Sequence, residues 1–256
     1  MPLVVVGLSH RTAPIEIRER LALSRAELPG VLRQLVESGA ATEAVVLSTC
    51  NRTEIYLSLF AEPQGVRAAH RLLSGRLDEA PAAVADRLYL HRDRAAAEHL
   101  FRVTAGLDSM VLGEAQIQGQ VKDAYAAARE TMSEAGPIAG SALHRLFQTA
   151  LSVGGRIRSE TEVGRGSASV SSAGVELAKK IFGSLRGRRV LVLGAGEMAQ
   201  ITLECLRAEG VRSAKVASRT LERAEEVARR CGAEAIEMED VWRELAKVEI
   251  VISSTA

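Results

Sequence analysis

The stretch RRVLVLGAGEMAQITLECLRAEGV, residues 188–211, decides the fold of the second half of the chain. A run rich in Val and Leu enters a turn that holds Gly194 and Gly196, and a helical pattern follows. In this context glycine permits a tight turn and lets the backbone approach a pyrophosphate, to which the helix N-terminus offers free N–H groups. The pattern therefore predicts a dinucleotide-binding unit. Its predicted cofactor contacts are Gly194, Ala195, Gly196, Glu197, Met198 and Ala199.

The segments after this turn continue to alternate between strand and helix patterns. They read, in order, SAKVASR, LERAEEVARRCG, AEAI, MEDVWRELAK and VEIVISST. Such an alternation predicts a Rossmann-like, doubly wound parallel sheet. The pattern stops after its fourth strand, so we expect an incomplete version of this sheet with 248–252 as an apolar edge strand.

The end of the second strand of this unit predicts which dinucleotide binds. An NAD site usually has Asp or Glu there for the ribose 2′-hydroxyl, whereas this chain has Ser218, Arg219 and Thr220. Arginine and hydroxyl groups suit a 2′-phosphate, which a carboxylate would repel. We therefore expect NADPH, with these three residues as contacts. The alternative for Arg219 is a solvated loop arginine.

The first third of the chain predicts a different fold class, a ferredoxin-like βαββαβ unit followed by helices. The predicted strands cover 3–8, 43–49, 54–60 and 87–92, and the predicted helices cover 24–39 and about 65–75. Ser24 and Glu27 have capping-box spacing, and Gly39 is expected to end the first helix. The whole chain is thus expected to be α/β combined with α+β.

Residues 94–160 have helical spacing, with a long helix over 141–161. The paired glycines Gly154 and Gly155 indicate a candidate hinge in that helix. The small, polar stretch 164–172 predicts a boundary. We therefore expect a catalytic domain over 1–150, a helical connector over 151–169 and a nucleotide-binding domain over 170–256.

The composition excludes several classes of protein. With a net charge of +1, no global field attracts nucleic acid or membrane, so any basic patch is local. The three cysteines lie far apart and form no CxxC pair, which argues against a metal site or a disulfide framework. The N-terminus matches neither a signal peptide nor a membrane span. A reduced, cytoplasmic protein is the expectation.

The stretch LSTCNRTEIY, residues 47–56, holds the candidate nucleophile. Cys50 comes where an apolar run ends and a polar turn begins. A cation such as Arg52 would lower the pKa of the thiol, or it would bind a substrate carboxylate. A lone cysteine is more often inert, and a redox sensor would need a resolving partner, of which the sequence gives no sign. Cys205 and Cys231 lie in helical patterns and are interpreted as structural.

A thiol nucleophile together with NADPH suggests one chemistry. The cysteine takes an activated acyl group as a thioester, which hydride then reduces to an aldehyde.

Several stretches resemble glutamyl-tRNA reductases over the whole chain. They are GLSHRTAPIEIRE (7–19), STCNRTEIY (48–56), HLFRVTAGLDSMVLGEAQIQGQVKDAY (99–125), SETEVGRGSASVSSAGVELAKK (159–180) and VLGAGEMA (192–199). The resemblance implies NADPH-dependent reduction of glutamyl-tRNA to glutamate-1-semialdehyde, the first step of the C5 route to tetrapyrroles such as porphyrins. It further implies a homodimer formed through a C-terminal domain beyond residue 256, and the downstream glutamate-1-semialdehyde aminotransferase as a partner.

The same resemblance implies roles for individual residues. Cys50 matches the nucleophile, and His99 matches a residue linked to activity. Thr49, Asn51 and Arg52 match the glutamate pocket. Further substrate contacts are implied at Ser109, Glu114, Ala115, Gln116 and Gln120. From the residues alone, His99 is interpreted as a packing histidine, and His10 stays outside the catalytic set.

The spacing of the implied contacts can be checked against helix geometry. Gln116 and Gln120 share one helix face, together with Gly113. Glu114 reaches the same ligand as Gln116 only if the helix begins near it. Taken alone, Ser109 is interpreted as an N-cap.

Two other functions stay open from the sequence. One is a reductase of another activated acyl group, such as an acyl phosphate. The other is a truncated module without turnover that binds tRNA or a partner protein.

Overall fold

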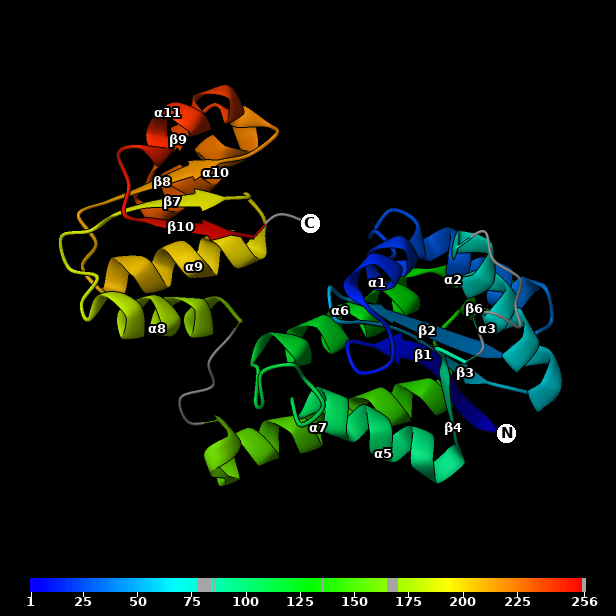
Figure 1. Ribbon diagram of the computed structural model, residues 1–256. Helices are drawn as coiled ribbons and strands as arrows, with labels where there is room; N and C mark the ends of the chain where they lie inside the picture. The colour runs from blue at the N-terminus through cyan, green and yellow to red at the C-terminus, as the bar shows by residue number, and fades with distance from the viewer. Residues whose placement is uncertain (78–83, 85, 135, 165–169, 255–256) are drawn as a thin grey trace. The chain divides into compact units, whose positions relative to one another are not determined.

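The computed structural model describes residues 1–77, 84, 86–134, 136–164 and 170–254 (Figure 1). The chain forms two compact units, Met1–Ser167 and Ala168–Ala256. Residues 151–160 belong to a helix of the first unit. Most of the predicted boundary at 164–172 falls on residues 165–169, which lie outside the described residues.

The first unit is built on a four-stranded sheet. Its strands are β1 (Leu3–Ser9), β2 (Glu43–Ser48), β3 (Arg52–Ser58) and β4 (Tyr89–Arg92). Their order is β2-β3-β1-β4, and all neighbouring strands are antiparallel. This order confirms the predicted ferredoxin-like arrangement. The third strand begins two residues earlier than predicted, which places Arg52 inside the sheet.

Within the described residues, helices α1 (Ile15–Leu21), α2 (Leu28–Glu37) and α3 (Glu62–Leu77) connect the strands of this sheet. The sequence did not predict α1, so two helices precede β2. Ser24 does bond to Glu27, but α2 begins only at Leu28, because Pro29 fits the first turn of a helix, where its missing N–H costs nothing. Gly39 has φ of 71° and ends α2, as predicted.

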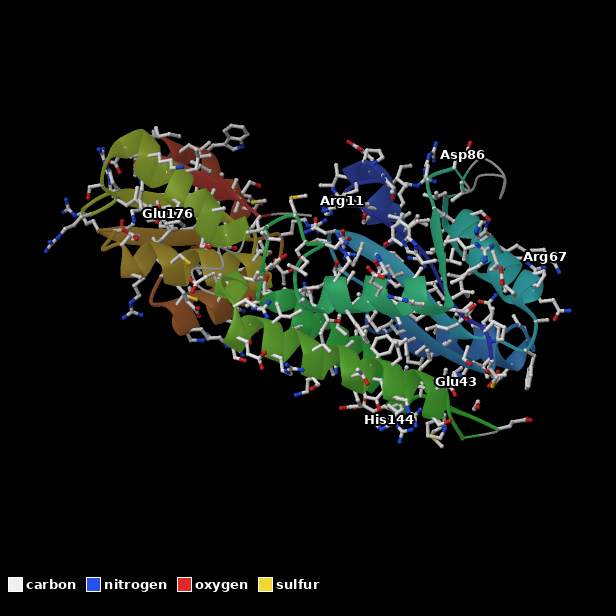
Figure 2. All side chains as sticks on the ribbon, turned by 90° about the horizontal axis from the view of Figure 1, so that it is seen from below. Arg11, Glu43, Arg67, Asp86, His144 and Glu176 are labelled. Atoms are coloured by element: carbon white, nitrogen blue, oxygen red, sulfur yellow. The ribbon has the colours of Figure 1, made fainter. Side chains whose placement is uncertain are left out.

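Further helices follow β4 and pack against the sheet. They are α5 (Asp93–Thr104), α6 (Gln116–Glu130) and α7 (Ser141–Glu160). A short β5–β6 pair (Met132–Ser133 and Gly136–Pro137) precedes α7, and the turn η1 (Glu162–Gly164) follows it. The carboxylate of Glu43, labelled in Figure 2, accepts the first free N–H groups of α7, from Ala142 and Leu143.

The predicted hinge in α7 is wrong, because the helix runs through Gly154 and Gly155 without a break. Gly154 is buried against α5. A Cβ there would lie 3.0 Å from Cγ2 of Thr104 and 3.1 Å from its carbonyl oxygen. The glycine therefore serves the close approach of two helices.

The second unit is a parallel sheet with helices on both faces. Its strands are β7 (Arg189–Leu193), β8 (Ser213–Ala217), β9 (Glu234–Ile236) and β10 (Ile250–Ser253), in the order β10-β7-β8-β9. Its helices are α8 (Val170–Phe182), α9 (Glu197–Ala208), α10 (Leu221–Cys231), the turn η2 (Met238–Asp240) and α11 (Val241–Leu245). Two hydrophobic clusters pack on its faces, and β10 is the edge strand, so the predicted Rossmann-like sheet is confirmed.

Candidate active site

Cys50 lies in the turn between β2 and β3 and is exposed. The hydroxyl of Thr49 accepts hydrogen bonds from the backbone N–H groups of Asn51 and Arg52, both at 3.2 Å. Nη1 of Arg18 in α1 donates to the carbonyl of Cys50 at 2.6 Å and to the Asn51 side chain at 3.0 Å. The turn is thus held from two sides, and the cysteine side chain is presented at its tip.

Arg52 does not reach out from this turn, because its side chain is only 1% exposed. The residues Arg52, Glu54 and Tyr56 alternate along β3 and share one face of the strand. Nη1 of Arg52 donates to Oε1 of Glu54 at 2.8 Å, and the Tyr56 hydroxyl donates to Oε2 at 2.5 Å. This face of β3 therefore carries a row of hydrogen-bonded polar side chains within the sheet.

Glu54 is the acceptor on which separate segments converge. The hydroxyl of Tyr89 in β4 donates to Oε1 of Glu54 at 2.5 Å, and Nε2 of His99 in α5 lies 2.8 Å from the same oxygen. We call Arg52, Glu54, Tyr56, Tyr89 and His99 the Glu54 cluster. Gly7 makes room for it, since a Cβ there would lie 2.9 Å from Cγ of Glu54.

The Glu54 carboxyl is held in its ionised form. Burial alone would raise its pKa, but the charge of Arg52 and the hydrogen bonds from His99 and Tyr56 outweigh burial, so the pKa lies well below its ordinary value. Because an ionised carboxylate only accepts, Nε2 of His99 must carry the hydrogen in their contact. His99 also lines the cavity described next, so it lies between the buried carboxylate and an open space.

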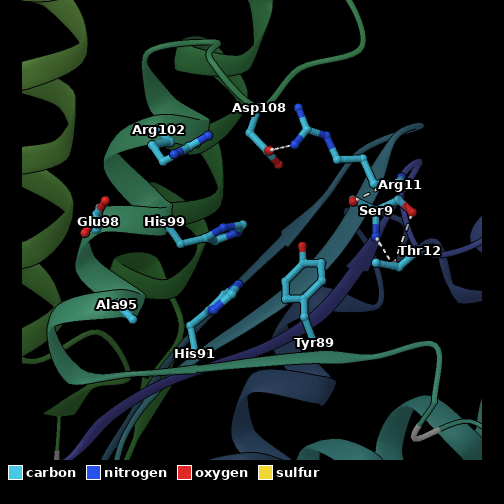
Figure 3. A pocket seen from close by; sticks show the side chains of 10 residues that line it. All are labelled: Ser9, Arg11, Thr12, Tyr89, His91, Ala95, Glu98, His99, Arg102 and Asp108. Atoms are coloured by element: carbon cyan, nitrogen blue, oxygen red, sulfur yellow. Dashed lines mark hydrogen bonds and ion pairs between the residues drawn. The ribbon is translucent and has the colours of Figure 1, made fainter.

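A cavity of about 460 Å³ opens beside the Glu54 cluster (Figure 3). The residues that line it come from the β1 end, β4, α5 and the loop after α5. They are Ser9, Arg11, Thr12, Tyr89, His91, Ala95, Glu98, His99, Arg102 and Asp108. The ring of His91 lies 4.8 Å from that of His99, centroid to centroid. Burial and the neighbouring His99 lower the pKa of His91, which favours a neutral imidazole in this wall.

Asp108 lines this cavity and also binds Arg52, the residue that follows the turn of Thr49, Cys50 and Asn51. Its carboxylate lies 3.2 Å from Nη1 of Arg11 and 3.2 Å from both terminal nitrogens of Arg52. Nη2 of Arg52 also donates to the Asp108 carbonyl at 2.6 Å. Both terminal nitrogens of Arg52 are therefore engaged, and this side chain fixes the loop that begins after α5.

The predicted substrate contacts beyond the turn lie in the loop 105–115 and at the start of α6. This helix begins at Gln116 with Ala115 as N-cap, so Glu114 and Gln116 lie next to each other at its start, as the contacts require. Two details of the prediction are wrong. Ser109 is not an N-cap, and Gly113 lies before the helix with φ of 78°, a conformation that suits glycine, so it shares no helix face with Gln120.

The glycine turn of the second unit has the predicted backbone geometry. Gly194 has φ of 115°, and its N–H donates to the Ala217 carbonyl at 2.8 Å. Gly196 is the N-cap of α9, and nothing lies within 4 Å of where its Cβ would point. This open approach to a helix N-terminus fits a pyrophosphate. The backbone of Ala195 to Ala199 spans the same turn.

The three predicted contacts for a 2′-phosphate follow the end of β8. Arg219 and Thr220 are exposed, and the Ser218 hydroxyl accepts from the Thr220 N–H at 3.5 Å. Thr220 is the N-cap of α10. No carboxylate lies among these three residues, so the site fits a phosphorylated ribose better than a free hydroxyl.

The structure thus brings part of the predicted set together. Thr49, Cys50 and Asn51 form one turn, and Arg52 meets His99 through Glu54. Sequence reasoning missed five residues around them: Arg18, Glu54, Tyr89, His91 and Asp108. Only Glu54 had a local signal, because a charge two residues from Arg52 in an apolar strand shares its face.

Further features of the chain concern metal binding, membrane crossing and the remaining cysteines. Among the described residues, no three His, Cys, Asp or Glu side chains are grouped so that they could hold a metal ion. In the same part of the chain, no helix combines the length and the apolar character that crossing a membrane requires. Burial raises the pKa of the Cys205 and Cys231 thiols, as expected for structural cysteines.

Comparisons with known proteins agree with the division of the chain into two units. The family model "Glutamyl-tRNAGlu reductase, N-terminal domain" matches residues 6–161, and the model "Shikimate / quinate 5-dehydrogenase" matches residues 176–256. The glutamyl-tRNA reductase of Rubrobacter xylanophilus is 49% identical over 255 residues, and that of Chloroflexus aurantiacus is 46% identical over 263. Each alignment covers 100% of this chain, but only 58% and 59% of the relative.

A solved structure is similar over the same length. The glutamyl-tRNA reductase from Methanopyrus kandleri is 38% identical, with a TM-score of 0.57. The match covers 99% of this chain and 58% of that one. The chain therefore spans somewhat more than half the length of the relatives that it matches.

Proposed function

Because the chain belongs to the glutamyl-tRNA reductase family, we propose that it accepts the glutamyl group of glutamyl-tRNA on Cys50 and reduces it to glutamate-1-semialdehyde. The exposure of Cys50 at the tip of a braced turn carries this proposal. A nucleophile that must meet the end of a large tRNA has to be accessible, and this thiol is.

In the first step the thiolate of Cys50 attacks the carbonyl carbon of the aminoacyl ester. The bond from that carbon to the tRNA ribose oxygen breaks, the ribose oxygen takes a proton, and a thioester remains on the protein. Glu54 holds Nε2 of His99 at 2.8 Å, so Nδ1 is the ring nitrogen proposed to exchange a proton with the reacting groups. His99 is thereby suited to receive the thiol proton and deliver it to the ribose oxygen.

The second step needs a reductant, and the second unit is proposed to hold NADPH. Gly194 to Ala199 would hold its pyrophosphate, and Ser218, Arg219 and Thr220 its 2′-phosphate. When bound, NADPH supplies the hydride that reduces the thioester. With one proton the products are the aldehyde and the Cys50 thiol.

The glutamyl side chain is proposed to bind beside the turn. Thr49, Asn51 and Arg52 form one part of this pocket, and Ser109, Glu114, Ala115, Gln116 and Gln120 form the other. Since both terminal nitrogens of Arg52 already bind Asp108 or Glu54, a substrate carboxylate would replace Asp108 at Arg52. Glu114 is proposed to meet the α-ammonium group. The family's homodimer and its aminotransferase partner stay predictions.

The release of glutamate from glutamyl-tRNA without NADPH tests the proposal. Wild type should hydrolyse the thioester slowly, and Cys50→Ser should release glutamate at least about 10³-fold more slowly, as the loss of a nucleophile usually costs. Cys205→Ser is a matched control, because Cys205 lies in α9 of the second unit. Equal release by wild type and Cys50→Ser would contradict the proposal and favour a module that only binds tRNA.

A further inference from the structure

The loop 105–115, which joins α5 to α6, is fastened at its first half by Arg52. Nη2 of Arg52 donates to the Asp108 carbonyl at 2.6 Å. The loop is also closed on itself, because the N–H of Gly113 donates to the carbonyl of Gly106 at 2.9 Å. The N–H of Glu114 donates to the carbonyl of Val111 at 3.1 Å within the same loop.

The second half of the loop also contacts the C-terminal end of α7 and η1. Nη2 of Arg158 donates to the main-chain carbonyl of Glu114. The neighbouring Gly113 lies directly against η1, since a Cβ there would be 2.2 Å from the Val163 carbonyl oxygen. Residues 113–116 and 158–163, which are more than forty residues apart in the sequence, therefore lie against each other. We call them the 114/158 contact.

Some hydrogen-bond donors at the 114/158 contact have no acceptor among the described residues. Nε2 of Gln116, two residues after Glu114, is buried and has no hydrogen-bond partner among the described residues, and the same holds for Nε of Arg158. A buried donor without an acceptor is costly, so the Gln116 amide is a candidate to donate to a bound group. A carboxylate or carbonyl oxygen of a substrate would satisfy Gln116.

We infer that Arg158 is a positioning residue of the substrate pocket, which fixes Glu114 and the start of α6 in the orientation that the glutamyl group needs. The inference rests on the proposed function, because it takes Glu114 and Gln116 as substrate contacts. Arg158 acts through the main chain of Glu114 and touches neither the reacting carbonyl nor the thiol.

The same helix offers a matched control two residues away. Arg156 is also on the last turns of α7, but its side chain is 70% exposed and pairs with Glu160 at 3.0 Å. Among the described residues, its side-chain hydrogen bonds and ion pair go to Glu160 and none goes to the loop 105–115. Removal of Arg156 therefore changes the charge of α7 by the same amount as removal of Arg158, without loosening the loop.

The test is the steady-state release of glutamate from glutamyl-tRNA without NADPH, measured for Arg158→Ala, Arg158→Lys, Arg156→Ala and Cys50→Ser. We expect Arg158→Ala to raise KM about tenfold, as the loss of one charge-assisted hydrogen bond implies, and Arg158→Lys to recover part of that loss. Arg156→Ala should match wild type. The rate at which iodoacetamide alkylates Cys50 should be unchanged in all three arginine variants, since the 49–52 turn is held by Arg18.

Equal KM values for Arg158→Ala and Arg156→Ala would overturn the inference, and so would a fall in Cys50 alkylation that accounts for the whole loss. If Arg158→Ala does not fold, Arg158→Lys decides alone: a KM above wild type supports the inference, and a wild-type KM overturns it. Glutamate release by Cys50→Ser at the wild-type rate would instead mean that the proposed function fails, whatever the arginine variants do.

Discussion

The glycine turn of the second unit and the Glu54 cluster of the first unit are built in opposite ways. The turn consists of consecutive residues from Gly194 to Ala199, and its chemistry belongs to the backbone. The cluster takes side chains from β3, β4 and α5 and joins them on one buried carboxylate. A local structure is specified by local sequence, whereas a converging one is specified by the packing of the whole unit.

The difference predicts how each region fails. Damage to the turn should remain within the second unit and act on cofactor binding. A substitution in the Glu54 cluster should lower the stability of the first unit and also change the position of His99. Both effects are expected because Oε1 of Glu54 binds both Arg52 and His99.

Glu54→Gln should have the largest effect of any change considered. The substitution keeps the size of the side chain but removes the charge that balances the buried Arg52. Breaking a buried ion pair from one side costs about 3–5 kcal/mol, and we expect that loss in the free energy of unfolding measured with urea. Glu62→Gln is the control, since its 2.6 Å pair with Arg92 lies at the surface and should be worth less than about 1 kcal/mol. Equal losses would contradict the role of Glu54.

Gly194→Ala should cost less and should remain in the second unit. Alanine at φ of 115° is strained, and its Cβ would lie 2.8 Å from the Ser254 carbonyl oxygen. We expect a loss of about 1–3 kcal/mol, seen as faster hydrogen exchange of the β7 amides, together with weaker NADPH binding. Gly174→Ala is the control, because nothing lies within 4 Å of its Cβ in α8, where alanine favours the helix. Faster exchange in β3 would break the separation of the two regions.

Acid should reveal the same cluster through proton linkage. The pKa of Glu54 is lowered in the folded protein, so the unfolded chain binds more protons just below the ordinary carboxyl pKa of 4.5. The stability from Glu54 is then fully present above about pH 4.5 and is lost as pH falls, at no more than about 1.4 kcal/mol per pH unit. Glu54→Gln should flatten urea stability against pH in this window relative to wild type. Parallel curves would mean that the carboxyl is not held ionised.

Arg219→Asp should have the smallest effect, confined to one ligand. Reversing the charge after β8 should weaken the binding of NADPH about tenfold more than that of NADH, measured as Kd by titration. Arg212→Asp is the control, since it precedes the same strand at its other end. Equal losses for both cofactors would refute the assignment of the 2′-phosphate site.

How much could be predicted from the sequence follows the same division. Both sheets, the glycine turn and the Cys50 turn were predicted, because strand periodicity and turn residues are local signals. The role of Arg52 was predicted less well. In the sequence it looks like a cation beside a thiol, whereas in the structure a carboxylate two residues further along β3 draws it into the core.

Other features could not be predicted for a related reason. Asp108 and His91 join the site through contacts with segments tens of residues away, which no local pattern reports. The glycines of α7 looked like a hinge, because a glycine that loosens a helix and one that lets two helices touch have the same local sequence.

The most direct test of the account is the mass of the intact protein after incubation with glutamyl-tRNA in the absence of NADPH and rapid quenching with acid. We expect a species heavier by one glutamyl group, mapped by peptide analysis to Cys50, removed by hydroxylamine and absent from Cys50→Ser. A protein that binds the charged tRNA but shows no adduct at Cys50, or carries one elsewhere, would contradict it.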